Sequence, residues 1–296
     1  MISQEQTPRE YWHGDFTYLL YDYDQTATIL KGNIGQESIY HVPDHVMVDG
    51  TRYTIVQVET CAYNRSETLE HLVFPDSHTY IPDDCFTDLP NLRSVRFGKN
   101  LRFLSRYVFA NCPKLKNFHI DKDNPYIKLH NGLILSKDGK KLHDSVVSPK
   151  HLIIPEGVEV IAACAWWHRN ELETITFPST LRSIHDYAFS SCRNLRKLVL
   201  PEGLEKCGAW TFYGNQNLNL IDFPSTMTGW GSMLFALCPN LEKIILRMPC
   251  VPEQVEKVDF DVVPIDTCQL YVPAQLLEQY RQHPAWGTFK NILPIK

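Results

Sequence analysis

The segment LRSIHDYAFSSCRNLRKLVLP, residues 181–201, contains a frame of apolar positions that recurs along the chain. From its first position, Ile184, the frame continues in steps of +5, +3, +3, +3 and +2 to Phe189, Cys192, Leu195, Leu198 and Leu200. Copies of the same frame begin at Val58, Ile81, Leu104, Ile161, Ile184, Cys207 and Trp230. Self-similarity at a fixed period is typical of stacked repeats, because one repeat cannot bury its own apolar face. The sequence therefore predicts a solenoid.

Successive copies are 23 residues apart except once, where the starts at Leu104 and Ile161 differ by one step of 23 plus an insertion of 34. Each copy contains an alternating segment such as LETITFP (172–178), which predicts a strand with one buried face. A proline ends that strand in several copies, because proline has no N–H to donate. A second extended stretch follows at 181–189, and we expect a short helical turn around 188–192.

The insertion, residues 121–152, contains two short apolar runs flanking SKDGK (136–140). Asp-Gly between such runs indicates a hairpin, so we expect a hairpin that leaves the solenoid unbroken. We predict one continuous domain. Its parts are N-terminal capping strands (1–57), the repeats (58–246, with the insertion at about 121–152) and a C-terminal cap (247–296) with a short helix at 275–283.

Charge and composition exclude some classes of protein. The net charge is -5, and the pI near 6.2 disfavours a nucleic-acid binder. No stretch reaches the roughly 18 apolar residues of a membrane helix, so we expect no membrane insertion. The start, MISQEQTPREYW, has neither the basic nor the apolar region of a signal peptide. This favours either a cytoplasmic protein or a mature form.

Two copies, SIHDYAFSSCRNLRKLVLP (183–201) and FLSRYVFANCPKLKNFHI (103–120), resemble the BspA-like, surface-antigen-type bacterial leucine-rich repeats. The insertion (123–142) and the tail (268–295) resemble segments that recur in that family, so the likeness covers about residue 50 to the end. The resemblance implies an α/β repeat solenoid, a right-handed β/α superhelix. It also implies a cell-surface or secreted location and adhesion through protein–protein binding, and it implies no active site.

The nine cysteines include three, Cys112, Cys192 and Cys238, that share one repeat position with Ser66, Leu89, Arg169 and Asn215. Rungs about 4.8 Å apart place cysteines two rungs apart beyond the roughly 7 Å between Cα atoms that a disulfide spans. We therefore predict buried free thiols there and at Cys207. For Cys250 and Cys268 in the irregular tail, a disulfide and two separate thiols both remain open.

Two pairs, His41 with His45 and Cys164 with His168, have spacings seen in metal sites. Zinc needs three or four converging ligands, and no further pair accompanies either of these. The chain also has no Gly-x-Ser-x-Gly motif and no glycine-rich phosphate loop. We therefore expect no metal, no cofactor and no enzymatic activity.

The candidate binding residues lie on the outward face of the predicted strands. They are His71, Arg96, His119, Thr176, Lys197, Asp222 and Lys243. Extended repeat surfaces commonly bind partners. A second group follows the buried aromatics: Trp167 and Tyr213, with Trp210 nearby. Exposed aromatic residues are enriched at binding hot spots.

The leading hypothesis is a monomeric, non-enzymatic scaffold that binds a host or bacterial surface protein. The alternative is a carbohydrate-binding module that uses Trp167, Trp210 and Tyr213. A third hypothesis is a structural accessory protein of the cell envelope.

Overall fold

The computed structural model describes residues 7–60, 62–63, 66–105, 108–109 and 111–295. The chain forms two compact units, Met1–Gly132 and Leu133–Lys296. We call them unit 1 and unit 2 and describe each by itself.

Unit 1 begins with a five-stranded sheet. Its strands, in spatial order, are β1 (Arg9–His13), β2 (Phe16–Tyr21), β3 (Thr26–Lys31), β6 (Thr51–Val58) and β5 (His45–Val48). All neighbours are antiparallel except β3 and β6, which are parallel. Alternation along β2 and most of β6 buries one face, including Leu20 and Ile55, whereas β3 is buried at the consecutive residues 27–29. The N-terminal segment predicted to form strands (1–57) therefore does so in its described part.

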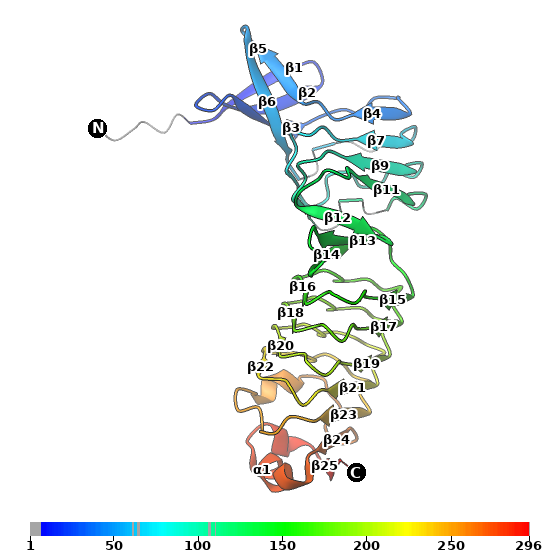
Figure 1. The fold of residues 1–296 in the computed structure, drawn as a ribbon, viewed down its shortest axis with the longest axis vertical. Helices are drawn as coiled ribbons and strands as arrows, with labels where there is room; N and C mark the ends of the chain where they lie inside the picture. Colours follow the sequence, from blue (N-terminus) through cyan, green and yellow to red (C-terminus); the bar gives the residue numbers. More distant parts are fainter. Residues whose placement is uncertain (1–6, 61, 64–65, 106–107, 110, 296) are drawn as a thin grey trace, which may run out of the picture. The chain divides into compact units, whose positions relative to one another are not determined.

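The repeats of unit 1 stack as parallel strands (Figure 1). The longer strands are β4 (Ile39–His41), β7 (His71–Val73), β9 (Ser94–Phe97) and β11 (Asn117–Ile120). The short strands β8 (Tyr80–Ile81) and β10 (Phe103–Leu104) pair on the other side, and β12 (Ile127–His130) follows β11 in the chain. Paired residues from β7 onward differ by 23, as the apolar frame predicts.

Unit 2 opens with the predicted hairpin, formed by β13 (Leu133–Ser136) and β14 (Lys141–Ser145), which pair antiparallel. Gly139 has a φ of 83° in the connecting turn, where its amide donates to the carbonyl of Ser136 at 2.8 Å. Such a positive φ suits glycine, which has no Cβ. The Asp-Gly signal therefore located the hairpin correctly.

Two parallel ladders follow in unit 2 (Figure 1). The sheet ladder consists of β15 (His151–Ile153), β17 (Thr174–Thr176), β19 (Lys197–Val199), β21 (Leu220–Phe223), β23 (Lys243–Leu246), β24 (Gln269–Val272) and β25 (Asn291–Pro294). The short-strand ladder continues from β14 through β16 (Val160–Ile161), β18 (Ser183–Ile184), β20 (Lys206–Cys207) and β22 (Gly229–Trp230).

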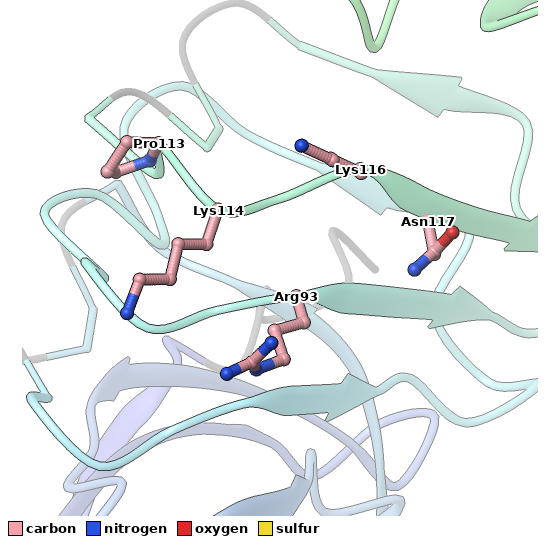
Figure 2. Close-up of a pocket in the computed structure, with 5 residues that line it drawn as sticks. All are labelled: Arg93, Pro113, Lys114, Lys116 and Asn117. Carbon is pink, nitrogen blue, oxygen red and sulfur yellow. The ribbon is translucent and has the colours of Figure 1, made fainter.

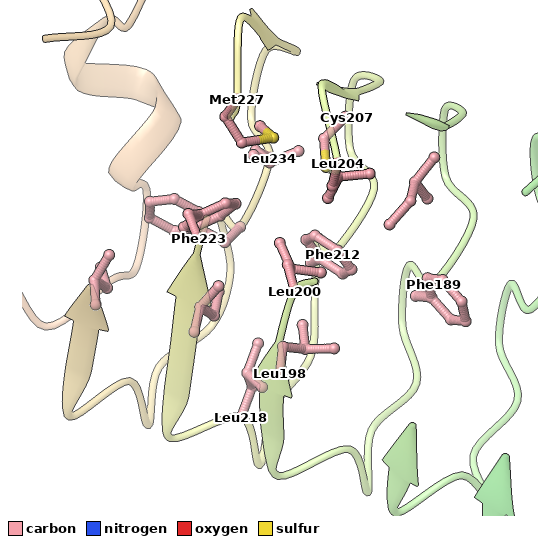
Figure 3. Packing of buried hydrophobic residues seen from close by; sticks show 14 of the residues in the cluster. Phe189, Leu198, Leu200, Leu204, Cys207, Phe212, Leu218, Phe223, Met227 and Leu234 are labelled. Atoms are coloured by element: carbon pink, nitrogen blue, oxygen red, sulfur yellow. The ribbon is translucent and has the colours of Figure 1, made fainter. Parts of the chain in front are cut away.

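The core of unit 2 lies between these two ladders. Leu198 of β19 and Leu200, which directly follows that strand, point toward Phe212 across the interior (Figure 3). Aromatic rings at one frame position form a column, in which the ring of Phe189 lies 6.1 Å from those of both Trp166 and Phe212. Each rung thus covers the apolar face of its neighbour, as the repeat model requires.

The expected helical turn around 188–192 is wrong. Tyr187 and Ser191 have positive φ angles of 57° and 58°, and this turn side contains no helix within the described residues. The amides of Tyr187, Phe189 and Ser191 donate to the next rung at 3.0, 2.9 and 2.7 Å. A helix would keep these bonds within its own turn. Bonding to the next rung joins the repeats on the side away from the sheet ladder.

The C-terminal cap contains the only α-helix in the described part of the chain. Its elements besides β24 and β25 are η1 (Lys257–Phe260), η2 (Ala274–Leu276), α1 (Leu277–Gln282) and η3 (Trp286–Thr288). Trp286 is fully buried, with its ring 4.8 Å from that of Phe260 and 5.7 Å from that of Trp230. The capping helix predicted at 275–283 is confirmed. No helix of the described residues is long and apolar enough to span a bilayer.

Candidate functional site

The outward face of the sheet ladder of unit 2 carries two rows of side chains, because residues two apart on a strand share a face. The first row, which we call the polar row, is His151, Thr174, Lys197, Leu220, Lys243, Gln269 and Asn291. The second, the apolar row, contains Ile153, Val199, Ile245, Tyr271 and Leu293, together with Thr176 and Asp222. The predicted residues Thr176, Lys197, Asp222 and Lys243 therefore lie on one surface.

The apolar row exposes large side chains to solvent. Ile153 is 70% exposed and Val199 is 49% exposed, whereas Leu198 between the two rows on β19 is buried. Single exposed apolar residues are ordinary, but here they recur along one ladder, alternating with Thr176 and Asp222 as far as Ile245. Apolar residues gathered on one face in this way indicate a candidate interaction surface. From the sequence, only Thr176 and Asp222 were selected in this row, and none of its apolar residues.

The two lysines of the polar row differ in their surroundings. Lys243 Nζ lies 5.0 Å from the centroid of the Tyr271 ring, a cation–π arrangement. The Tyr271 hydroxyl in turn donates to Gln269 Oε1 at 3.0 Å. Lys197 is exposed on β19 between Thr174 and Leu220. Lys197 therefore presents its charge to solvent, while Lys243 and Tyr271 present a combined aromatic and cationic surface.

Asp222 is held by an ion pair within unit 2. Arg247 donates to both of its carboxylate oxygens, from Nε at 2.8 Å and from Nη2 at 2.9 Å. Only 15% of the Asp222 side chain is exposed. This fork-shaped pairing compensates the negative charge on the face. The sheet face of unit 2 is therefore apolar and basic, because its outward acid is already neutralised.

In unit 1, His71, Arg96 and His119 lie on the outward face of β7, β9 and β11. His71 Nδ1 is 2.7 Å from Ser94 Oγ on the next strand. Arg96 and His119 are exposed and are register partners. The structure thus places the predicted residues of unit 1 on a shared face of their own ladder.

The aromatic candidates lie on the turn side of unit 2. Trp167 and Tyr213 are half-buried, and the Trp167 ring meets that of His168 at 4.7 Å. Trp210 stacks on Tyr187 with ring centroids 5.0 Å apart and planes inclined by 8°. Its indole Nε1 also donates to Met233 Sδ at 3.3 Å. These contacts cover one face of the Trp210 ring with a neighbouring ring.

The repeat position that Cys112, Cys192 and Cys238 share supplies a hydrogen-bond donor. The thiols of Cys112, Cys192 and Cys238 donate to carbonyls 26 residues earlier, at 3.5, 2.9 and 3.4 Å. At the same position Asn215 Nδ2 donates to the carbonyl of Phe189 at 3.0 Å. Burial raises the pKa of Cys192 and of Cys238 to about 12, so both remain thiols. The prediction of buried free thiols is confirmed for Cys192 and Cys238, and their role as donors was not indicated by the periodicity.

The remaining candidates carry no metal or disulfide chemistry in the described residues. Cys250, which is exposed, and Cys268, which is buried, are separate thiols, so the alternative of a disulfide between them is wrong. In the described ranges no group of three or more His, Cys, Asp and Glu side chains could hold a metal ion. A shallow hollow in unit 1, lined by Arg93, Lys114 and Lys116 among others, was not indicated by the repeat frame.

Stacked rungs of 23 residues, with a parallel sheet ladder on one side, define a leucine-rich repeat protein. The family model described as "BspA type Leucine rich repeat region" matches six copies over residues 51–130 and 139–258, more than half of the chain. The chain therefore belongs to the BspA-type leucine-rich repeat family.

Two solved structures show a similar fold. The pneumococcal vaccine antigen PcpA is 15% identical with a TM-score of 0.61, and the match covers 98% of this chain and 99% of that one. A leucine-rich repeat protein from Eubacterium ventriosum is 15% identical with a TM-score of 0.52, covering 90% of this chain and 84% of that one. At such identity the likeness is one of fold alone. A search of curated protein sequences found no match.

Proposed function

We propose that the protein is a non-enzymatic scaffold that binds a protein partner through the outward face of the sheet ladder of unit 2. The observation that carries this proposal is the apolar row, in which Ile153 and Val199 are 70% and 49% exposed on a regular ladder. Leucine-rich repeats are a family typical of interaction scaffolds, and their extended surfaces commonly bind partners.

The chemistry of this face defines the partner that fits it. Apolar side chains of the partner would cover Ile153 and Val199, and a carboxylate would pair with Lys197. Because Arg247 already neutralises Asp222, no acid on this face repels such a group. We place the partner among host or bacterial surface proteins, in an adhesive role. The contact itself needs only an apolar surface with an acidic group beside it.

The proposal is tested with the full chain, cell-surface extracts and crosslinking, followed by affinity measurement on the partner identified. Val199→Glu places a charge in the apolar row, and Lys197→Glu reverses the adjacent cation. Each should weaken binding roughly 30-fold, the loss of about 2 kcal/mol that defines a hot spot. Val258→Glu is the matched control, because Val258 is similarly exposed (52%) but lies in η1 of the cap.

Equal binding by Val199→Glu and the wild type would contradict the assignment of the face. A loss of the same size in Val258→Glu would also contradict it, because the effect would then follow from added charge alone. Unchanged circular dichroism in each variant separates loss of contact from loss of fold.

The carbohydrate hypothesis receives no comparable support. Sugars stack on open aromatic faces, and Trp210 packs one face against Tyr187 while its Nε1 bonds to Met233. Alanine at Trp167 and Tyr213 tests this alternative directly, through glycan binding at intact folding.

A further inference from the structure

A shallow hollow of about 270 Å³ lies in unit 1 at the start of the outward sheet face. Its lining residues are Arg93, Pro113, Lys114, Lys116 and Asn117 (Figure 2). The volume is slightly below the roughly 300 Å³ at which small-molecule sites usually begin. A hollow of this size can hold one compact charged group and the first atoms of the molecule to which that group is attached.

Arg93 and Lys116 are neighbours in successive rungs, since the amide of Lys116 donates to the carbonyl of Arg93 at 3.3 Å. Like charges on directly neighbouring strands destabilise each other. Elsewhere this repeat position avoids that arrangement: unit 2 has Lys150, Glu173, Arg196, Asn219 and Glu242 in order. Along the described rungs within each unit, Arg93 and Lys116 are the one adjacent pair of equal charge at this position.

Lys114 adds a third cation where the repeat otherwise has none. The same position holds Asn91, Glu171, Asn194, Asn217 and Asn240 in other rungs. Lys114 Nζ donates to Asn91 Oδ1 at 2.6 Å, which keeps the ammonium beside the rung that carries Arg93. Arg93, Lys114 and Lys116 therefore line the same hollow, and the Lys114 ammonium is held beside the rung of Arg93.

One acid partly compensates this charge. Arg93 Nε lies 3.3 Å from Glu70 Oε2, and both side chains are substantially exposed. Three cations and one carboxylate leave a local charge of +2. A bound dianion would neutralise it and relieve the repulsion between Arg93 and Lys116.

We propose that this hollow binds a phosphate monoester group. Such a group carries about -1.5 to -2 charges at pH 7 and has three strong acceptor oxygens. Arg93, Lys114 and Lys116 supply charge-assisted donors, and the Asn117 amide supplies a neutral one. A carboxylate or a sulfate monoester carries a single negative charge and would leave one cation uncompensated. The site belongs to unit 1 and does not depend on the proposed function of the unit 2 face.

The test uses the full chain at about 0.01 M ionic strength, where screening is weak. Inorganic phosphate is titrated first, followed by glucose 6-phosphate, glucose 6-sulfate and glucose, with affinity measured by calorimetry. Lys114→Asn and Lys116→Asn use the residue that other rungs have at these positions (Asn91 and Asn219), which preserves the fold. Each should weaken binding of phosphate and glucose 6-phosphate roughly tenfold, the usual effect of losing a hydrogen bond to a charged group.

Glu70→Gln gives the opposite expectation. Removal of this carboxylate frees the Arg93 guanidinium and raises the local charge, so phosphate should bind several-fold more tightly. Misfolding could not produce such a gain. Lys290→Asn, which removes an exposed lysine in unit 2, is the control and should leave binding unchanged.

Unchanged phosphate affinity in both lysine variants would overturn the assignment, as would the absence of phosphate binding by the wild type. Equal affinity for glucose 6-sulfate and glucose 6-phosphate would overturn the choice of a dianionic ester. If Lys290→Asn weakened phosphate binding as much, the effect would follow from the net charge of the protein alone, and the assignment of the site would be overturned.

Discussion

The backbone amide of Met233 donates to the carboxylate of Asp259. In earlier rungs the amide at this position bonds to the next rung, as Trp210 does to the carbonyl of Ser232 at 2.9 Å. At Met233 the regular rungs end, and a buried aspartate, 5% exposed, replaces the missing carbonyl. The same carboxylate accepts from the amide of Glu256 at 2.6 Å. One side chain thus joins the last rung to the cap.

Replacement of Asp259 by alanine should destabilise unit 2 by about 2–4 kcal/mol, because two part-buried backbone amides lose their charged acceptor. Asp259→Asn should cost roughly half as much, since its amide oxygen can accept one of the two bonds. Urea unfolding gives both values. Asp261→Asn is the control: Asp261 is exposed and contributes its backbone carbonyl to Leu237, so its loss should stay within about 0.5 kcal/mol. Equal stability of Asp259→Ala and the wild type would contradict this account of the cap.

Val262 should be a site at which substitution stabilises the protein. Its φ of 62° lies in the left-handed region, which costs an L-residue with a Cβ about 1–2 kcal/mol. Asparagine tolerates this region better, and the side chain is 55% exposed, so little packing is lost. Val262→Asn should raise the free energy of unfolding by about 0.5–1 kcal/mol in urea.

The matched control for Val262 is Val258→Asn. Val258 is equally exposed but is not among the positive-φ residues of the described chain. Its substitution should not stabilise. A gain of the same size at both positions would mean that replacing an exposed valine by a polar residue is what stabilises, and the argument from backbone strain would fail.

The repeat period predicted the sheet ladder and the core, because burial between stacked rungs leaves a strict apolar frame in the sequence. It did not predict the turn side. Segments such as 187–191 contain no glycine, yet Tyr187 and Ser191 adopt left-handed conformations. The bonds from one turn to the next rung stabilise these conformations. This stabilisation comes from the neighbouring repeat, so local propensity did not indicate it.

The outward residues of the candidate site were located by the same period, but their chemistry was not. Tyr271 was missed because Lys243 pairs with Gln269, a step of 26 that breaks the frame. Ile153 lies one step of 23 before Thr176, directly after the insertion, so extending the frame back by one step would have found it. The neutralisation of Asp222 depends on Arg247. This arginine directly follows β23 and lies outside the repeat frame, so the sequence did not indicate that it pairs with Asp222.

His78 should make unit 1 sensitive to acid. Burial lowers its pKa to about 4, from about 6.5 in unfolded chains. Because the folded pKa is the lower one, the stabilising contribution is complete above pH 6.5 and is lost as the pH falls toward 4. The loss amounts to about 3 kcal/mol. Relative to His78→Leu, the wild type should therefore lose stability between pH 6.5 and 4, as measured by unfolding at each pH. Parallel curves for the two proteins would contradict this assignment.

Cysteine should be able to replace Asn215 with little change in stability, because other rungs have cysteine at the same repeat position. Asn215 donates to the carbonyls of Phe189 and Phe212 at 3.0 and 2.7 Å, but its buried Oδ1 has no hydrogen-bond partner among the described residues. Asn215→Cys would remove that unsatisfied oxygen and keep a donor toward Phe189, as Cys192 does toward Trp166 at 2.9 Å. Its free energy of unfolding should lie within about 1 kcal/mol of the wild type.

Asn215→Ala is the comparison that isolates the hydrogen bond from the volume of the side chain. It leaves the two carbonyls without their side-chain donor and creates a small void, so it should cost about 2–3 kcal/mol. If Asn215→Cys lost as much as Asn215→Ala, the donor role of the thiol would be refuted. The cysteines would then act only as small apolar side chains. A cysteine variant close to the wild type would instead explain why one repeat position accepts both asparagine and cysteine: both direct a donor to the carbonyl 26 residues earlier.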